Sequence, residues 1–433
     1  MRARVLSKVT RRLLPFMLVL YVAAYLDRIN VGFAALEMKK DLAWSDTIYG
    51  LGAGLFFVGY FLFEIPSNLI LERVGARLWI ARIMISWGLL SSAMMFVKSA
   101  EAFYVLRFLL GAAEAGFFPG MLLYLTYWFP AAERARAMAQ FITAAMLAWI
   151  VGGPVSGLVL RLDGLGGLQG WQWLFLLEGL PSVVLGLVVL ACLVDRPSQA
   201  RWLTGEERDW LERELRHERL ETPVKRPLLQ ALREGKTWLL ALVYFLLTVA
   251  SYGFSLWLPQ VIAEVSGLLP EQVGWLSAVP YALTAIGMVL IGGHSDRTQE
   301  RRWHVALPLW VAAAGMAVAA QTAQPVTVVA ALSVAAIGNF GCLGPFWALA
   351  TRHLGRSAAA GGIALINSLG NLGGFLGPFA VGRLKDLTSG YGSGFLFLAG
   401  ALLAAGLLAL RLKDSTAPQP QPSAAGSTTL GTV

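Results

Sequence analysis

Long apolar runs with few charged residues follow one another along nearly the whole chain. A window of about 19 residues, the length that spans a bilayer as a helix, detects twelve such runs. They cover residues 13–37, 46–70, 78–97, 102–128, 136–160, 171–193, 237–263, 271–293, 304–322, 326–350, 358–382 and 392–412. Lipid offers the backbone no hydrogen-bond partner, so runs of this length form helices. The pattern therefore predicts an all-α membrane protein with twelve transmembrane helices.

Composition and charge support this class. Hydrophobic residues make up 57% of the chain and charged residues 14%, with a mean hydropathy of +0.62; soluble domains carry about 25% charged residues. Cys192 and Cys342 lie within apolar runs, which favours small buried side chains over a disulfide or a metal site. Basic loops facing anionic lipid account for the net charge of +9. We therefore expect a bilayer as the surrounding partner, and no nucleic acid, cofactor or metal.

The distribution of lysine and arginine predicts the orientation. Most of the 35 basic residues fall in loops on the side that holds both termini and the segment 194–236. By the positive-inside rule this side is cytoplasmic. The first run follows a basic start, but it is too long for a signal peptide and lacks a small-residue cleavage site. We expect a multi-pass protein of the inner (cytoplasmic) membrane, with both termini in the cytoplasm.

Two halves of the sequence repeat each other. Glu72-Arg73 corresponds to Asp296-Arg297, and Gly153-Pro154 to Gly377-Pro378, each pair 224 residues apart. Parallel repeats of this kind place a substrate site near the membrane midplane, between the halves, and imply alternating access. The predicted organisation is a cytoplasmic N-terminal segment, an N-terminal six-helix bundle, a cytoplasmic connector with an amphipathic helix, a C-terminal six-helix bundle and a disordered tail, at residues 1–12, 13–193, 194–236, 237–412 and 413–433.

Several segments resemble a known family of transporters. The two six-helix halves, the connector and the loop "NLILERVGARLWIAR" resemble the major facilitator superfamily, although Glu72 stands where its loop motif usually has aspartate. Within it, "YLDRINVGFA", "RFLLGAAEAGFFPG" and "AAAGGIALINSLGNLGGFLGP" resemble the anion:cation symporters. That resemblance implies proton-coupled uptake of small organic carboxylates, such as sugar acids, tartrate or phthalate.

Four charged residues fall within the first and fourth predicted helices: Asp27, Arg28, Arg107 and Glu114. Each costs about 2.5–3.5 kcal/mol at bilayer depth even on lenient scales, so they require compensation. Arg107 and Glu114 share a helix face about 10 Å apart along the axis, too far to touch directly. Because the four charges sum to zero, we expect them to offset one another around a shared polar cavity. The alternative is a set of structural ion pairs between the two helices.

These residue types fit an anion site coupled to protons. The planar fork of Arg28 matches the two oxygens of a carboxylate. An anion that competes for an arginine releases its carboxylate partner, which can then take up a proton. The resemblance to galactonate-type symporters implies that Asp27 and Glu114 carry protons, that Arg107 mediates between them and the substrate, and that Arg28 anchors the substrate.

Other polar side chains could contact the rest of the anion. The resemblance matches Tyr25, Tyr60, Trp347 and Asn367 to positions near the site, and Asn371 shares a helix face with Asn367. Relatives that bind hexonates carry a glutamine in the fifth helix, where this chain has only Ala and Met at 144–146. This departure favours a smaller or more apolar ligand.

Two other functional classes were weighed. Gly153-Pro-x-x-Gly157 is part of a motif associated with proton-coupled drug exporters, but a cavity with Arg28 and Arg107 suits lipophilic cations poorly. An enzyme would need a nucleophile with a base, or a metal cluster, and the pattern contains neither. The prediction is a transporter, functional as a monomer, that imports a small organic anion with H⁺; a proton-coupled exporter of drugs or metabolites is the alternative.

Overall fold

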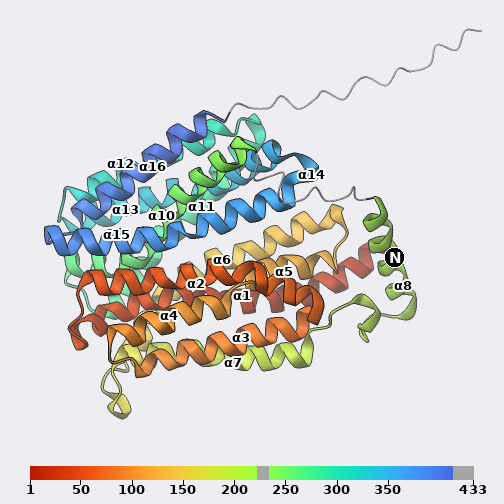
Figure 1. Ribbon diagram of the computed structural model, residues 1–433, viewed down its shortest axis with the longest axis horizontal. Helices are drawn as coiled ribbons and strands as arrows, with labels where there is room; N and C mark the ends of the chain where they lie inside the picture. Colours follow the sequence, from red (N-terminus) through yellow and green to blue (C-terminus); the bar gives the residue numbers. More distant parts are fainter. Residues whose placement is uncertain (222–233, 413–433) are drawn as a thin grey trace, which may run out of the picture.

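The computed structural model describes residues 1–221 and 234–412, and within these ranges all regular structure is helical. Twelve of the described helical stretches are long and apolar enough to cross a membrane. Figure 1 shows them side by side, in two groups that follow the two halves of the chain. The prediction of an all-α, twelve-helix membrane protein is confirmed. The predicted disordered tail and part of the connector, residues 222–233, lie outside the described residues.

The helices of the first half and of the connector begin and end as follows: α1 Arg2–Asp41, α2 Asp46–Val74, α3 Ala76–Ala93, α4 Ala100–Glu114, α5 Phe117–Thr126, α6 Ala131–Leu160, α7 Gly170–Cys192 and α8 Gly205–Glu221. The second half contains α10 Gly235–Ser266, α11 Pro270–Thr298, α12 Arg302–Ala320, α13 Pro325–Gly341, α14 Leu343–Asn371, α15 Gly373–Thr388 and α16 Gly392–Leu410. Several helices extend beyond the predicted apolar runs. Hydropathy detects the lipid-compatible stretch, whereas backbone hydrogen bonding continues into polar sequence.

Three predicted spans are interrupted. The fourth is divided between α4 and α5 at Gly116, which has φ of 86° and whose Cβ position is occupied by Ser67. The tenth is divided at Cys342 and the eleventh at Leu372. Helical hydrogen bonding in α14 also continues through the predicted connection between the tenth and eleventh spans. Discontinuous helices of this kind place polar groups at the middle of a transporter.

Glycine contacts join the two halves at one end of the bundle. We call the end where α1 begins and α8 lies, at the right of Figure 1, the connector end, and the opposite end the distal end. A Cβ on Gly50 would lie 2.5 Å from the Pro378 carbonyl oxygen, and one on Gly153 would lie 2.5 Å from that of Gly274. Backbone atoms cannot move aside as a flexible side chain can, so only glycine permits these contacts.

These contacts follow the sequence repeat. Gly50 and Gly274 are 224 residues apart, and Pro378 corresponds to Pro154, the residue after Gly153, so the two glycine contacts join equivalent places in the two halves. Gly32 packs against the Leu256 backbone, and these two residues are themselves 224 apart. The helices α1 and α10 therefore cross on the pseudo-twofold axis, which passes between the halves.

Charged residues add a second set of contacts at the distal end. Lys39 of α1 pairs with Asp46 of α2, and Lys385 of α15 lies 3.6 Å from the same carboxylate. The neighbouring Asp386 accepts hydrogen bonds from the backbone N–H groups of Asp46 (3.1 Å) and Thr47 (2.7 Å). We call Lys39, Asp46, Lys385 and Asp386 the distal clasp. Together with the glycine contacts, it holds the halves together at this end.

The connector docks on the N-terminal half through α8. Thr204 and Glu207 form the capping box that their spacing predicts, with bonds of 3.3 Å and 3.0 Å. Lys8 of α1 donates to the Glu207 carboxylate at 2.6 Å, and Leu211 and Leu215 are buried beneath the helix. One carboxylate thus caps α8 and attaches it to α1.

Gly274→Ala should open the distal end. Its Cβ would overlap the Gly153 carbonyl oxygen, and overpacking of this kind costs about 1–3 kcal/mol. Spin labels at the exposed positions Leu165 and Leu269, in a cysteine-free background, should show a larger population of long distances by pulsed electron resonance. Gly292→Ala is the matched control, because a Cβ there meets no atom within 4 Å. An unchanged distribution in the Gly274 variant would contradict the close contact.

Acid should weaken the docking of α8. The hydrogen bond from Lys8 holds the pKa of the Glu207 carboxyl below its ordinary value. The stabilisation is therefore present at neutral pH and is lost as the pH falls below about 4, toward the lowered pKa. Glu207→Gln should lower Tm at pH 7, and its difference from the wild type should shrink on acidification. Glu206→Gln, on the exposed side of the same turn, should show no such pattern; a pH-independent difference would argue against this assignment.

Candidate functional site

Asp27 and Arg28 are adjacent in α1 but have different neighbours. Successive residues of an α-helix point about 100° apart, so their side chains leave α1 in different directions. Arg28 contacts residues of α4 and of α10, in the other half, whereas the hydrogen-bond donors to Asp27 lie within the N-terminal half. The two charges therefore have separate environments.

Arg28 lies where the halves meet. Its guanidinium donates a hydrogen bond to the Glu114 carboxylate of α4, and its other terminal nitrogen lies 3.5 Å from the Tyr252 hydroxyl of α10. Tyr252 is 224 residues from Arg28, so this contact lies on the pseudo-twofold axis. The Arg28 side chain is 13% exposed, and its Nε has no hydrogen-bond partner among the residues that the structure describes. One hydrogen-bond donor of the guanidinium is thus left unused.

The break after α4 positions the partner of Arg28. Glu114 is the last residue of α4, directly before the Ala115–Gly116 break, and its side chain is 3% exposed. Removing the Glu114 carboxylate from water is costly, and the close positive charge of Arg28 compensates it. The pair joins the first and fourth predicted spans, whose charges the sequence analysis expects to offset one another.

Arg107 is fully buried without a carboxylate partner in the described part of the chain. Its Nη2 donates to the Ala53 carbonyl at 3.3 Å, and its Nε and Nη1 have no partner. The guanidinium carbon lies 5.0 Å from the centre of the Phe56 ring, which offers a cation–π contact. As expected from their spacing, Arg107 and Glu114 do not pair.

Asp27 occupies a closed polar cluster within the N-terminal half. Its carboxylate, 2% exposed, accepts hydrogen bonds from Ser91 (2.5 Å), Trp87 (2.8 Å), Ser182 (3.2 Å) and Asn30 (3.3 Å). The expectation that all four charges surround one cavity is therefore wrong in this structure: Arg28 and Glu114 pair directly, while Asp27 is held by neutral donors. Four hydrogen bonds replace the water that a buried carboxylate loses, so Asp27 needs no arginine beside it.

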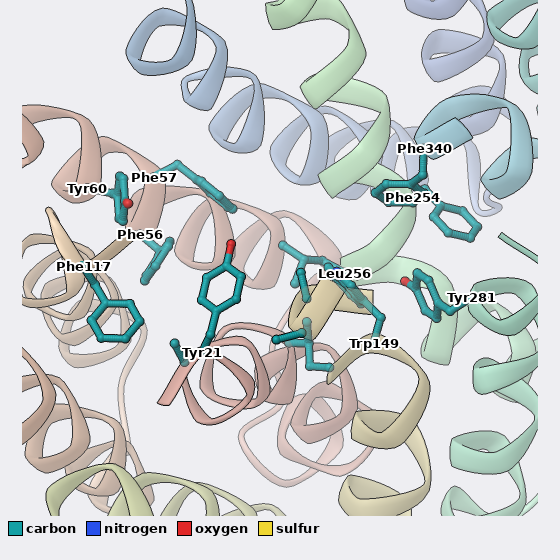
Figure 2. Close-up of a cluster of buried hydrophobic side chains, with 14 of the residues drawn as sticks. Tyr21, Phe56, Phe57, Tyr60, Phe117, Trp149, Phe254, Leu256, Tyr281 and Phe340 are labelled. Atoms are coloured by element: carbon teal, nitrogen blue, oxygen red, sulfur yellow. The ribbon is translucent and has the colours of Figure 1, made fainter. Parts of the chain in front are cut away.

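Aromatic rings surround the Arg28 side of the site. The Arg28 guanidinium carbon lies 5.2 to 5.3 Å from the ring centres of Tyr25, Phe56 and Tyr60. Figure 2 shows Tyr21 close to Phe56, one of these rings. Trp149 lies beside Tyr281 of the other half, with the two ring centres 4.8 Å apart. Tyr25 and Tyr60, both expected near the substrate, thus lie against the expected anchor.

The expected substrate residues of the second half lie on α14. Asn367 donates to the Glu64 carboxylate of α2 at 3.1 Å. The Trp347 ring packs against Tyr244 of α10 at 4.9 Å between centres. Asn371, the last residue of α14, is partly buried beside the break before α15. The structure thus brings Asn367 to the interface between the halves, and Trp347 contacts α10 instead.

Sequence reasoning missed two buried carboxylates, Glu64 and Glu178. Glu64 is bound by two α14 donors, and Glu178 accepts from Ser156 at 2.8 Å. A signal was available, because both are acidic residues within the predicted spans 46–70 and 171–193. An ionisable group inside a span indicates a functional site by default.

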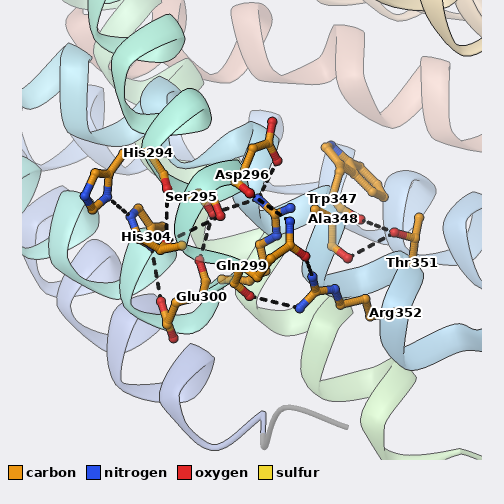
Figure 3. Close-up of polar contacts among 12 residues, drawn as sticks. His294, Ser295, Asp296, Gln299, Glu300, His304, Trp347, Ala348, Thr351 and Arg352 are labelled. Atoms are coloured by element: carbon orange, nitrogen blue, oxygen red, sulfur yellow. Dashed lines mark hydrogen bonds and ion pairs between the residues drawn. The ribbon is translucent and has the colours of Figure 1, made fainter. Parts of the chain in front are cut away.

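At the connector end, polar contacts hold together helices of the same half. Figure 3 shows Arg352 of α14 against Gln299, with its Nη2 2.5 Å from the Gln299 side-chain oxygen. Asp296, in the repeated motif, lies 2.7 Å from Arg301. In the N-terminal half, the backbone N–H of Arg77 donates to Asp195, at the start of the connector, at 2.8 Å. These bonds hold neighbouring segments together without crossing between the halves, whereas the distal clasp joins the two halves.

Replacing Arg28 and Arg107 by methionine should have unequal effects. Arg28→Met leaves the Glu114 carboxylate buried and unpaired, at a cost of about 3–5 kcal/mol. Arg107→Met removes a cation that no carboxylate contacts, so the free energy of unfolding should change less or rise. Unfolding of detergent-solubilised protein by SDS measures both. Adding Glu114→Gln to Arg28→Met should recover stability; equal losses in the two single variants would contradict the assigned pairing.

Known proteins resemble the chain over nearly its full length. A model of the Major Facilitator Superfamily matches residues 17–378. A protein of Agrobacterium vitis named "Putative tartrate transporter" is 49% identical over 417 residues, which cover 96% of this chain and 93% of that protein. A quinolone resistance transporter of Acinetobacter baumannii is 44% identical over 92% of each chain. The inner membrane transport protein RhmT of Escherichia coli strain K12 is 39% identical, over 94% of this chain and 95% of that one.

The fold also matches solved structures. The crystal structure of a bacterial homologue of the human lysosomal transporter Spinster, in an inward-facing and unoccupied conformation, superimposes with a TM-score of 0.75. It covers 94% of this chain and 95% of that one at 18% identity, a likeness of fold alone. The family match and the relatives identify a transporter, not an enzyme. The chain belongs to the major facilitator superfamily, as its resemblance to the anion:cation symporters of that superfamily led us to expect.

Proposed function

We propose that this protein imports a small organic carboxylate together with protons, by alternating access across the inner membrane. The observation that carries the proposal is the Arg28–Glu114 pair, a partly exposed arginine fork at the interface of the halves that already holds a carboxylate. An arginine that binds an internal carboxylate has the geometry to bind that of a substrate. Two Agrobacterium vitis relatives, 49% and 48% identical, are named as tartrate transporters, which supports a small organic acid as the cargo.

Competition for Arg28 couples the substrate to protons. A substrate carboxylate that binds Arg28 displaces Glu114, and an unpaired carboxylate in this buried position takes up a proton. The positive charge of Arg107, farther along α4, favours the arrival of an anion. Asp27 is the second proton carrier; it exchanges its proton when α3 and α7 open the cluster around it. A monocarboxylate with one proton, or a dicarboxylate such as tartrate with two, then crosses as a neutral load, which lowers the cost of passing through a low-dielectric interior.

The two halves, residues 13–193 and 237–412, move against each other around the α1–α10 crossing. With both termini and the connector in the cytoplasm, the distal end faces outward. The clasp and the glycine contacts then close the outer side, which supports an inward-facing state. Every element of this cycle lies within one chain, and a monomer suffices for transport.

Proton-coupled export is the second candidate. A relative that is 44% identical over 92% of this chain is named as a quinolone resistance transporter. Quinolones carry a carboxylate on an aromatic ring system, so Arg28 and the aromatic residues around it could serve an exported anion as well as an imported one. The two candidates differ in the direction of net flux under a proton gradient, and share the anchor.

Uptake into proteoliposomes distinguishes them. With an inward proton gradient, labelled tartrate or another small carboxylate from a panel should accumulate, and a protonophore should abolish accumulation. Arg28→Lys should reduce binding about tenfold or more despite the retained charge, because one ammonium cannot match the bidentate fork. Asp27→Asn and Glu114→Gln should impair accumulation more than substrate exchange. Arg161→Lys, at an exposed distal position, should behave like the wild type. Expulsion of a quinolone without uptake of any carboxylate would favour the exporter.

A further inference from the structure

Glu64 is a buried carboxylate between the halves that the transport cycle above does not use. It lies on α2 and is 5% exposed. One of its oxygens accepts a hydrogen bond from the Asn367 amide at 3.1 Å, and the other accepts one from the Ser368 hydroxyl at 2.9 Å. Both donors belong to α14 of the second half. The α14 site that could hold an anion is therefore occupied by a carboxylate of the protein itself.

The same face of α2 connects Glu64 to Arg28. Tyr60 precedes Glu64 by four residues, about 6 Å along the helix axis, and so lies on the same side. The Tyr60 ring centre is 5.3 Å from the Arg28 guanidinium carbon. Thus Arg28, Tyr60 and Glu64 follow one another along the interface, from the bundle axis toward the connector end.

A fixed negative charge beside an anion site discriminates among anions. It repels a substrate with nothing but carboxylate oxygens on that side, because two acceptors would face each other without a proton between them. A hydroxyl on the substrate replaces this repulsion by an attraction, since it donates a hydrogen bond to the fixed carboxylate. Hydrogen bonds to charged groups are stronger than neutral ones, so the presence or absence of this donor has a large effect on affinity.

We propose that Glu64 is a specificity-determining residue, which selects carboxylates that carry a hydroxyl group on the side remote from Arg28. In the absence of substrate, Asn367 and Ser368 bind Glu64; in its presence, the substrate hydroxyl takes over as donor and frees the α14 groups to bind the substrate. Because those bonds join α2 to α14, the exchange also loosens one contact between the halves. This inference rests on the proposed function, in which Arg28 holds the substrate carboxylate.

The test compares two ligands that differ only in hydroxyl groups. Tartrate and succinate are both four-carbon dicarboxylates, and their affinities are measured by competition in proteoliposome exchange. The wild type should prefer tartrate, and Glu64→Gln should reduce the tartrate-to-succinate affinity ratio by about tenfold or more, chiefly by admitting succinate. Glu178→Gln is the matched control, because this buried carboxylate bonds Ser156 inside the N-terminal half and should leave the ratio unchanged. An unchanged ratio in Glu64→Gln would overturn the inference.

A second measurement requires no substrate. Asn367→Asp places a carboxylate against Glu64 and should lower Tm, while the double variant Glu64→Gln with Asn367→Asp restores an amide–carboxylate pair and should recover most of it. No recovery would refute the contact itself. If the double variant recovers Tm but the wild type binds no carboxylate, the proposed function fails and takes this inference with it. If the wild type binds tartrate but Glu64→Gln leaves the tartrate-to-succinate affinity ratio unchanged, only the inference fails.

Discussion

The ion pair between Arg28 and Glu114 is the interaction on which the rest of the site depends. It lies at the crossing of α1 and α10, where the pseudo-twofold axis passes between the halves and where a helix break sets the direction of Glu114. A buried pair adds little to stability compared with apolar packing, but breaking it is costly. A ligand carboxylate that takes the place of Glu114 beside Arg28, without exposing either charge, keeps the arginine paired throughout the exchange. A carboxylate transporter requires such an exchange.

The two ends of the bundle solve different physical problems. At the distal end, glycine lets α2 pack on α15 and α6 on α11 with their backbones in contact, and the clasp of charged residues lies at the rim. The Lys39, Asp46 and Lys385 side chains are 14% to 16% exposed while this end is closed, so their charges depend on one another until the end opens and water reaches them. At the connector end, bonds such as that between Arg352 and Gln299 remain within one half. Each half can therefore move as a rigid body while the hydrogen bonds within it stay intact.

Asp27 and Arg107, both buried within the N-terminal half, differ in how fully their hydrogen-bonding groups are satisfied. Asp27 is surrounded by four donors from α1, α3 and α7, so its charge is stabilised by dipoles. Arg107 has a single carbonyl and an aromatic face, and two of its nitrogens have no partner. A buried cation whose N–H donors lack acceptors leaves hydrogen-bonding capacity unsatisfied. These unused donors favour an anion near α4, in keeping with the role that we propose for Arg107 in attracting the substrate.

The sequence by itself determined the spans, the repeat and the presence of charges at half-depth, because bilayer thickness imposes a length on every helix and a 224-residue interval needs no coordinates to detect. The directions of the side chains were decided by tertiary structure. Asp27 and Arg28 are neighbours in the chain, yet helix rotation turns one toward Trp87 and the other toward Tyr252. Glu64 meets Asn367 across 303 residues of chain. Such contacts depend on how rigid helices pack, and periodicity along one helix carries no information about which surface of another will face it.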